Sequence, residues 1–378
     1  MQVAGCRSLS QIAVGVVCAL SLLVGSPSPA RADPPPGHPV PRNLGQVVSS
    51  VGVFRLNYDQ TKYLGHLKSY GFIVVQSYMR GLLPELRAAA PHLRVFMYFN
   101  ASGAYDEADQ KFPTGLPYRA TVLAHPYWAV HSATGSPVTF WGGQLHLYDI
   151  GDPAYQRAWA SRAAADARSG GFDGVFVDDV NFGESMRPAW TARSPKYNTD
   201  LKWTLATESF LKTVSPILRS NHLLVMPNVG TTWQSDMGRA VKWGRIARGY
   251  FQEHFLRFGE SGDTKVLRGR DWAHTTTLER KLEAAGVPFY AGTAGRARGD
   301  EAAMRYTRFS FLLFDKRAGG GFAWFAARDP YNAAWTDNLG RAVTAPHRVG
   351  SVWTRQLSGG TIRVDPATGD AEIVVRPG

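Results

Sequence analysis

The chain has 378 residues and carries 42 basic against 30 acidic side chains, a formal net charge of +12. A chain of this length can bury one large core and can remain a single domain if it is an α/β barrel. The Lys and Arg residues are scattered rather than gathered into runs, so we interpret them as a solubilising surface and expect no nucleic-acid binding.

The first 32 residues have the pattern of a cleavable export signal. Arg7 precedes an apolar run from Ile12 to Val24, and Ala30-Arg31-Ala32 is a small-x-small cleavage pattern. The run is too short for a comfortable membrane span, and no second stretch of about 20 apolar residues follows it. We therefore expect a secreted, extracellular protein without stable membrane insertion. Both cysteines lie inside the signal, so we expect no disulfide in the mature protein.

Residues 33–46 are rich in proline and predict an extended leader. From residue 47 to residue 345, short apolar runs alternate with segments of helical spacing, which is typical of parallel strands joined by crossover helices. Eight strands are expected, at Gly52–Leu56, Phe72–Gln76, Arg94–Phe99, Gly174–Asp178, Leu223–Met226, Gly249–Gln252, Pro288–Gly292 and Gly321–Phe325. The sequence therefore predicts an α/β fold, a (β/α)8 or TIM barrel, over residues 47–345.

Helical signals between these strands support the barrel. Leu82, Leu83 and Leu86 form an apolar stripe at helical spacing. The helix before the fourth strand should open at Asp152-Pro153, a side-chain cap followed by a proline suited to the first turn, and should end at Gly170-Gly171.

Two further segments lie outside the regular barrel pattern. Between the third strand and that helix, residues 101–151 form an insertion far longer than an ordinary connection, which is typical of loops that carry function. After the barrel, β-prone pieces at Trp353, Thr361–Val364 and Ile373–Val375 are separated by glycine-containing turns. They predict a small C-terminal β segment over residues 346–378.

Polar residues end three of the expected strands. The carboxyl ends of the strands form the active face of a parallel barrel, and Asp178, Asn228 and Glu253 follow the fourth, fifth and sixth apolar runs there. Successive residues of a regular strand face opposite sides, so only one of Asp178 and Asp179 can point to the barrel centre. We expect Asp178 to be the central group and Asp179 to belong to the following loop.

Two carboxyl groups at one barrel mouth suggest hydrolysis of a glycosidic bond, which needs one acid and one nucleophile or base. Asp178 and Glu253 fit these roles, with Asn228 between them as a hydrogen-bond partner of a sugar hydroxyl. A single Asp at a strand end more often caps a helix, so the hypothesis depends on all three strand ends together. Further substrate contacts are expected from Tyr98, Asn100, Trp141 and Trp324.

Alternatives at these positions and other chemistries are less favoured. Asp173 is expected to be a turn residue before its strand, and Glu260, in the glycine-rich loop after the sixth strand, is the rival of Glu253 as proton donor. The His residues show no metal-ligand spacing, and the chain has no Gly-x-Ser-x-Gly elbow and no phosphate-binding glycine loop. We therefore expect no metal and no cofactor, and a polysaccharide or oligosaccharide as the substrate.

The same residues resemble a known family. The stretch Gly171 to Asp179, the strand that ends at Asn228 and the stretch Gly249 to Glu253 are similar to the hypothetical glycoside hydrolase-like family 15. More distantly, they resemble the endo-α-1,4-polygalactosaminidase barrels and the retaining barrels with a nucleophile Asp after strand four and an acid/base after strand six. The likeness spans Val51 to Val364.

The resemblance implies a TIM barrel with a carbohydrate-active site. By position, it implies Asp178 as nucleophile and Glu253 as acid/base, while the doubled Asp178-Asp179 leaves the identity of the nucleophile open. Our hypothesis is a retaining glycoside hydrolase that acts on O-glycosidic bonds of an extracellular polysaccharide. The alternative is a catalytically silent barrel that binds cell-wall glycan, aided by its basic charge.

Overall fold

The computed structural model describes residues 44–47, 71–106, 114–140, 145–183, 194–230, 236–258, 265–294, 300–316, 319–325 and 339–375. The expected export signal and the expected strand Gly52–Leu56 lie outside these residues. Within them, no helix combines the length and the apolar character that a membrane crossing requires.

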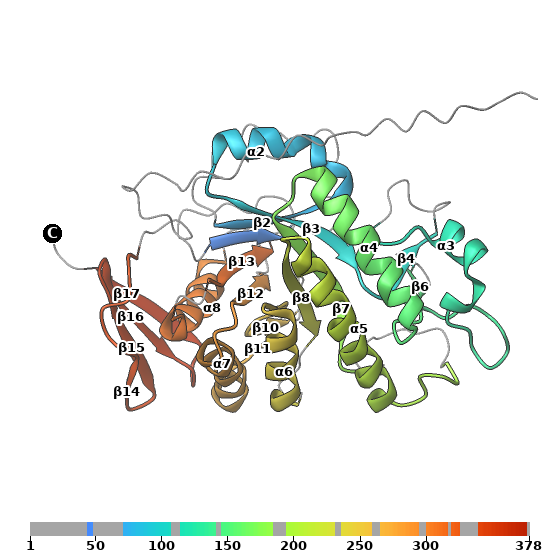
Figure 1. Cartoon of the computed structure of the whole chain (residues 1–378). Helices are drawn as coiled ribbons and strands as arrows, with labels where there is room; N and C mark the ends of the chain where they lie inside the picture. The colour runs from blue at the N-terminus through green and yellow to red at the C-terminus, as the bar shows by residue number, and fades with distance from the viewer. Residues whose placement is uncertain are drawn as a thin grey trace, which may run out of the picture. The chain divides into compact units, whose positions relative to one another are not determined.

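Eight parallel strands close into a barrel (Figure 1). Each strand is hydrogen-bonded to the next around the ring, in the order β1, β2, β3, β7, β8, β9, β12, β13 and back to β1. These strands are β1 (Leu44–Val47), β2 (Phe72–Gln76), β3 (Arg94–Asn100), β7 (Gly174–Asn181), β8 (Leu224–Gly230), β9 (Tyr250–Gln252), β12 (Phe289–Ala294) and β13 (Gly321–Phe325). The predicted (β/α)8 barrel fold is confirmed.

The first strand differs from the prediction. Seven of the strands overlap their predicted segments, but β1 lies at Leu44–Val47, in the segment that the sequence assigned to the proline-rich leader. It is placed by its neighbours, because it pairs in parallel with both β2 and β13. A run of four residues that includes Gly45 and Gln46 carries too little apolar periodicity to mark a strand by itself.

The helices that connect the strands lie outside the ring (Figure 1). They are the 3-10 helix η2 (Ser77–Leu82) and the α-helices α2 (Leu83–Ala89), α4 (Pro153–Gly170), α5 (Asp200–Ser220), α6 (Met237–Ala247), α7 (Gly269–Ala284) and α8 (Glu301–Phe314).

The ends of α4 are those predicted. The Asp152 carboxylate accepts the N–H groups of Ala154 and Tyr155 at 2.7 and 2.9 Å, and Gly171 ends the helix with φ of 76°.

The long insertion after β3 contains a small sheet of its own. Its antiparallel strands β4 (Gly103–Tyr105), β6 (Leu145–Leu147) and β5 (Thr139–Phe140) lie in that order, and α3 (Tyr118–Ala124) and the 3-10 helix η3 (Pro126–Trp128) connect β4 to β5. Trp128 is buried, with its ring stacked on His125 and edge-on to Tyr155 of α4. This tryptophan therefore anchors the insertion to the barrel helices.

The barrel interior has its own core, separate from the core between strands and helices. It consists of Phe72, Val74, Phe96, Tyr98, Phe176, Met226, Phe251, Tyr290 and Ala323. Along β2 and β3 these inward positions recur every second residue. The same period, counted from the inward residues of β7, β8 and β9, gives Asp178, Asn228 and Glu253 as the next inward positions toward the carboxyl ends. The two-residue alternation of the strands thus places three polar side chains at the barrel mouth.

A four-stranded antiparallel sheet follows the barrel, as predicted. Its strands, in spatial order, are β14 (His347–Val349), β15 (Val352–Leu357), β16 (Gly360–Asp365) and β17 (Asp370–Val375). The buried guanidinium of Arg355 donates to the carbonyl oxygens of Leu312, Asp315 and Thr344. Arg355 therefore ties this sheet to the end of α8.

Candidate active site

Side chains from four neighbouring strands converge at the carboxyl end of the barrel. Tyr98 on β3 donates its hydroxyl proton to Oδ2 of Asp178 on β7. Asn228 on β8 donates through Nδ2 to Asp178 Oδ1 at 2.8 Å and to Oε2 of Glu253, directly after β9, at 2.6 Å. The structure therefore brings together the two carboxyl groups and the amide that the sequence placed at three strand ends.

The amide of Asn228 limits the distance between the two carboxyl groups. Both hydrogen bonds start from one nitrogen, so the accepting oxygens of Asp178 and Glu253 lie at most about 5.4 Å apart, the two bond lengths laid end to end. Asn228 Oδ1 is buried and accepts no hydrogen bond from the described residues. Two carboxyl groups this close can act on one bond, one as proton donor and the other as nucleophile or base.

A β-bulge in β7 explains why both consecutive aspartates lie at the site. Val177 pairs with Pro227 and Val180 with Val229, so Asp178 and Asp179 together stand opposite Asn228. Asp179 has φ of 60°, the left-handed region that Asp tolerates better than most residues. The expectation that Asp179 belongs to the loop is wrong, because β7 continues past the end of the apolar run to Asn181.

Asn100, at the end of β3, holds Asp179. Its Nδ2 donates to Asp179 Oδ2 at 2.6 Å, while its Oδ1 accepts the backbone N–H groups of Ser102 and Gly103 at 3.0 and 2.7 Å. Trp159 of α4 donates to the Asn100 carbonyl oxygen at 2.8 Å. Because both ends of the amide are engaged, the orientation of the Asp179 carboxylate is fixed by the fold.

The turn that follows β9 carries Glu253. His254 and Leu256 have φ of 61° and 58°, and such strained conformations persist only where the surroundings hold them. The buried Phe255 anchors the turn, since its N–H donates to the Gly292 carbonyl oxygen at 2.6 Å. Glu253 itself is 36% exposed, so a ligand can reach its carboxyl group from solvent.

A buried ion pair closes the same turn. Arg257 begins the short strand β10 (Arg257–Phe258), which pairs with β11 (Lys265–Val266). Its guanidinium is 2% exposed and lies 2.6 Å from the carboxylate of Asp300, the residue that caps α8. The sequence alone does not reveal this pair, because its members are far apart in the chain and neither ends an apolar run.

The electrostatic field at the site is negative. Burial, and then the charges of Asp179 and Glu253, raise the pKa of Asp178 to about 7, against hydrogen bonds from Tyr98 and Asn228 that lower it. Burial, and then the charges of Asp178 and Asp179, raise the pKa of Tyr98 well above its usual range. Burial and the same two residues also raise the pKa of Tyr105 on β4. A group that carries or develops positive charge is therefore stabilised here.

The other predicted site residues are placed as follows. Trp141 and Glu260 lie outside the described residues, and Trp324 belongs to β13 but its side chain lies outside the described part of the chain. Asp173 precedes β7, where its carboxylate accepts the Val95 N–H at 2.7 Å, as expected for a turn residue. Tyr105 was not predicted, because its nearness to the aspartates depends on how the insertion folds.

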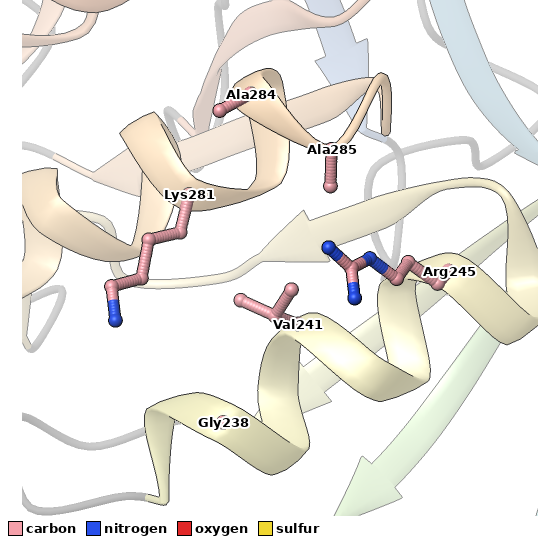
Figure 2. A pocket seen from close by; sticks show the side chains of 6 residues that line it. All are labelled: Gly238, Val241, Arg245, Lys281, Ala284 and Ala285. Atoms are coloured by element: carbon pink, nitrogen blue, oxygen red, sulfur yellow. The ribbon is translucent and has the colours of Figure 1, made fainter.

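A hollow of about 380 Å³ lies away from this site, between α6 and α7 (Figure 2). Its lining consists of Gly238, Val241, Arg245, Lys281, Ala284 and Ala285. The polar side chains of that lining are Arg245 and Lys281, with no carboxyl group beside them, and we assign no reaction to it. Across the described ranges, no cluster of three or more His, Cys, Asp or Glu side chains could hold a metal ion.

Comparison with known proteins gives one family match. The hypothetical glycosyl hydrolase family 15 matches residues 87–361, which is most of the chain. No curated protein sequence matches.

Several solved structures are similar to this chain at low identity. Ega3 of Aspergillus fumigatus, in complex with galactosamine, is 11% identical over 78% of this chain and 95% of its own, with a TM-score of 0.43. A dextranase of Flavobacterium johnsoniae with isomaltotriose is 12% identical over 79% of this chain and 38% of its own, with a TM-score of 0.49. An α-galactosidase of Geobacillus stearothermophilus with 1-deoxygalactonojirimycin is 9% identical over 85% of this chain and 46% of its own, with a TM-score of 0.47. The chain spans less than half the length of the last two proteins.

Proposed function

The chain belongs to the hypothetical glycosyl hydrolase family 15, and from that premise we propose that it is a secreted hydrolase that cleaves O-glycosidic bonds of an extracellular polysaccharide with retention of configuration. The observation that supports this most directly is the amide of Asn228, which holds Asp178 and Glu253 together. Retaining enzymes have carboxyl groups about 5 to 5.5 Å apart and inverting enzymes about 6.5 to 9.5 Å. The two oxygens that accept from the Asn228 nitrogen lie at most about 5.4 Å apart, and this closeness favours the first class.

The roles of the two groups follow from their surroundings. Asp178 accepts hydrogen bonds at both oxygens, from Tyr98 and Asn228, which suits a carboxylate that attacks as an anion. Its oxygen forms a bond to the anomeric carbon as the bond from that carbon to the leaving oxygen breaks. Glu253, the more exposed group, donates its proton to the leaving oxygen. Water then attacks the glycosyl-enzyme ester, gives its proton to Glu253 and releases Asp178.

The proton needed for the reaction belongs to the pair. The reaction begins with one proton on the pair, placed on Glu253, and with a negative charge on Asp178. Burial, and then the charges of Asp179 and Glu253, raise the pKa of Asp178 to about 7, and because the two carboxyl groups titrate together the pair keeps one proton until a pH near that value. Above that pH the acid is lost, so kcat/KM should fall as the pH rises through about 7.

The mature protein, tested on a panel of microbial and plant polysaccharides, decides between hydrolysis and binding alone. We expect release of reducing ends from at least one glycan, and Asp178→Asn should lower kcat by about 1,000-fold or more while glycan binding persists. Asp166→Asn, which removes an exposed carboxylate on α4, is the control and should keep full turnover. A protein that binds a glycan and hydrolyses none would instead be the silent barrel.

The stereochemistry has its own test. Proton NMR of the first product, recorded before the sugar mutarotates, should show the anomer of the starting linkage. The opposite anomer would show that water attacks the sugar directly and would remove the role of Asp178 as nucleophile.

A further inference from the structure

The bulge leaves one carboxylate at the site beyond the two that the reaction uses. Asp179 stands with Asp178 opposite the single residue Asn228, within β7, and has φ of 60°. Asn100 holds its Oδ2 at 2.6 Å, through an amide whose oxygen is engaged by two backbone N–H groups. A bulge with a strained residue beside an active site is a feature that requires a functional reason.

We propose that Asp179 is a positioning residue rather than the nucleophile: its fixed negative charge, held beside Asp178 by the bulge and by Asn100, keeps one proton on the reacting pair. This inference rests on the proposed function for the identity of that pair. It answers the question that the doubled aspartate leaves open in the sequence.

Geometry argues against Asp179 as nucleophile. Asn228 joins Glu253 to Asp178, and Asn100 holds Asp179 on the side of β3. An attacking carboxylate must work with an acid across one glycosidic bond, and the carboxyl group that shares a donor with Glu253 is Asp178.

The groups around Asp178 act on it in opposite directions. From β3, the Tyr98 hydroxyl hydrogen-bonds to Asp178, and from β8 the Asn228 amide does so; both favour the anion. Asp179 on β7 and Glu253 after β9 place negative charge beside it and favour the protonated form. Tyr105 on β4 lies in the field of both aspartates, and His254 has its Nε2 3.8 Å from Glu253. Of the two charges that oppose ionisation of Asp178, Asp179 is the one that takes no part in proton transfer to the sugar.

The test compares Asp179→Asn with the parent chain. The Asn side chain keeps an oxygen for the Asn100 amide and tolerates positive φ, but carries no charge. In carbon-13 NMR of aspartate-labelled protein, with Asp178 assigned through Asp178→Asn, we expect the titration midpoint of Asp178 to fall by about one to two pH units. The alkaline limb of kcat/KM should move to lower pH by the same amount. Asp166→Asn removes an equal charge from the outer face of α4 and should shift neither.

A second variant protects the test against misfolding. In Asp179→Gly the residue accepts φ of 60° without strain and the carboxylate is gone, so it should give the same shift as Asp179→Asn.

Two results would overturn the inference. One is an unchanged midpoint of Asp178 in both variants. The other is a loss of turnover in Asp179→Gly that added azide restores, which would make Asp179 the nucleophile. The NMR titration needs no substrate, so a protein that hydrolyses no glycan would refute the proposed function while the charge effect of Asp179 is still measured.

Discussion

The guanidinium of Arg257 lies 2.6 Å from the carboxylate of Asp300, and this ion pair joins the turn that follows β9 to the first turn of α8. The turn it closes is the one that carries Glu253 and contains the strained residues His254 and Leu256. The position of the proposed proton donor therefore depends on a contact between two segments that share no strand pairing.

Asp300→Ala should destabilise the protein strongly. It leaves a guanidinium that is 2% exposed without this partner and removes the side chain that accepts the Ala303 N–H at the start of α8. We expect the free energy of unfolding, from urea titration, to fall by about 3 kcal/mol. Glu301→Gln is the control, because Glu301 is exposed and its pair with Arg305 is 3.5 Å long, and it should cost under about 0.5 kcal/mol. Equal losses in the two variants would contradict a structural role for the ion pair.

Tyr98→Phe should move the pH profile in the direction opposite to Asp179→Asn. The Tyr98 hydroxyl stabilises ionised Asp178 and lowers its pKa, so its removal should raise that pKa above the value of about 7. We expect the alkaline limb of kcat/KM to move to higher pH by about one unit, with kcat lowered by about 10-fold or more. Tyr105→Phe is the matched control, since no hydrogen bond from Tyr105 lowers the pKa of Asp178. A shift toward lower pH in Tyr98→Phe would contradict this account of the site.

Gly174→Ala tests the close approach of β7 and β8 below the site. A Cβ at Gly174 would lie 2.5 Å from the Leu224 carbonyl oxygen and 2.9 Å from the Phe96 ring, so the strands must move apart. We expect a loss of about 2 to 3 kcal/mol in unfolding free energy. At Gly81, on the exposed surface of η2, the same substitution meets nothing within 4 Å and should be neutral or stabilising by up to about 1 kcal/mol. A tolerated Gly174→Ala would show that the barrel adapts more easily than its packing indicates.

Glu279→Gln should stabilise the protein at alkaline pH. Glu279 of α7 is fully buried, neither of its carboxyl oxygens has a hydrogen-bond partner among the described residues, and burial followed by the charges of Asp315 and Glu283 raises its pKa well above the usual value. Above pH 4.5 the unfolded chain binds fewer protons than the folded one. The free energy of unfolding is therefore highest at low pH, and it decreases as the pH rises toward the pKa of Glu279 in the folded state.

The glutamine side chain imitates the protonated form and removes this dependence. The variant should match the parent at pH 4 and exceed it at pH 8 by on the order of 2 kcal/mol in thermal or urea unfolding. Glu372→Gln, at an exposed pair with Arg363, should show no such divergence. Parallel pH curves for Glu279→Gln and the parent would mean that Glu279 ionises freely in the folded state.

The sequence predicted what depends on local periodicity. Seven barrel strands were found because each is an apolar run bounded by glycine, proline or polar residues. Asp178 and Asn228 were expected at the mouth because they follow such runs, and the structure joins them by a hydrogen bond. The ends of α4 were predicted because a cap and a left-handed glycine act through their own backbone neighbours.

What was missed depends on contacts between distant segments. The four residues of β1 form a strand because they pair in parallel with both β2 and β13. The bulge at Asp179 exists only in the register of β7 against β8, and no property of a single strand reveals it. Tyr105 reaches the aspartates through the fold of the insertion, which has no periodic pattern of its own.

The bulge also has a consequence for the history of such barrels. Deletion of Asp179 would leave one residue opposite Asn228 and would let β7 and β8 pair residue for residue. A single lost codon would therefore remove the carboxylate that Asn100 holds and change the acidity of the proposed nucleophile, while the pairing of the two strands continues.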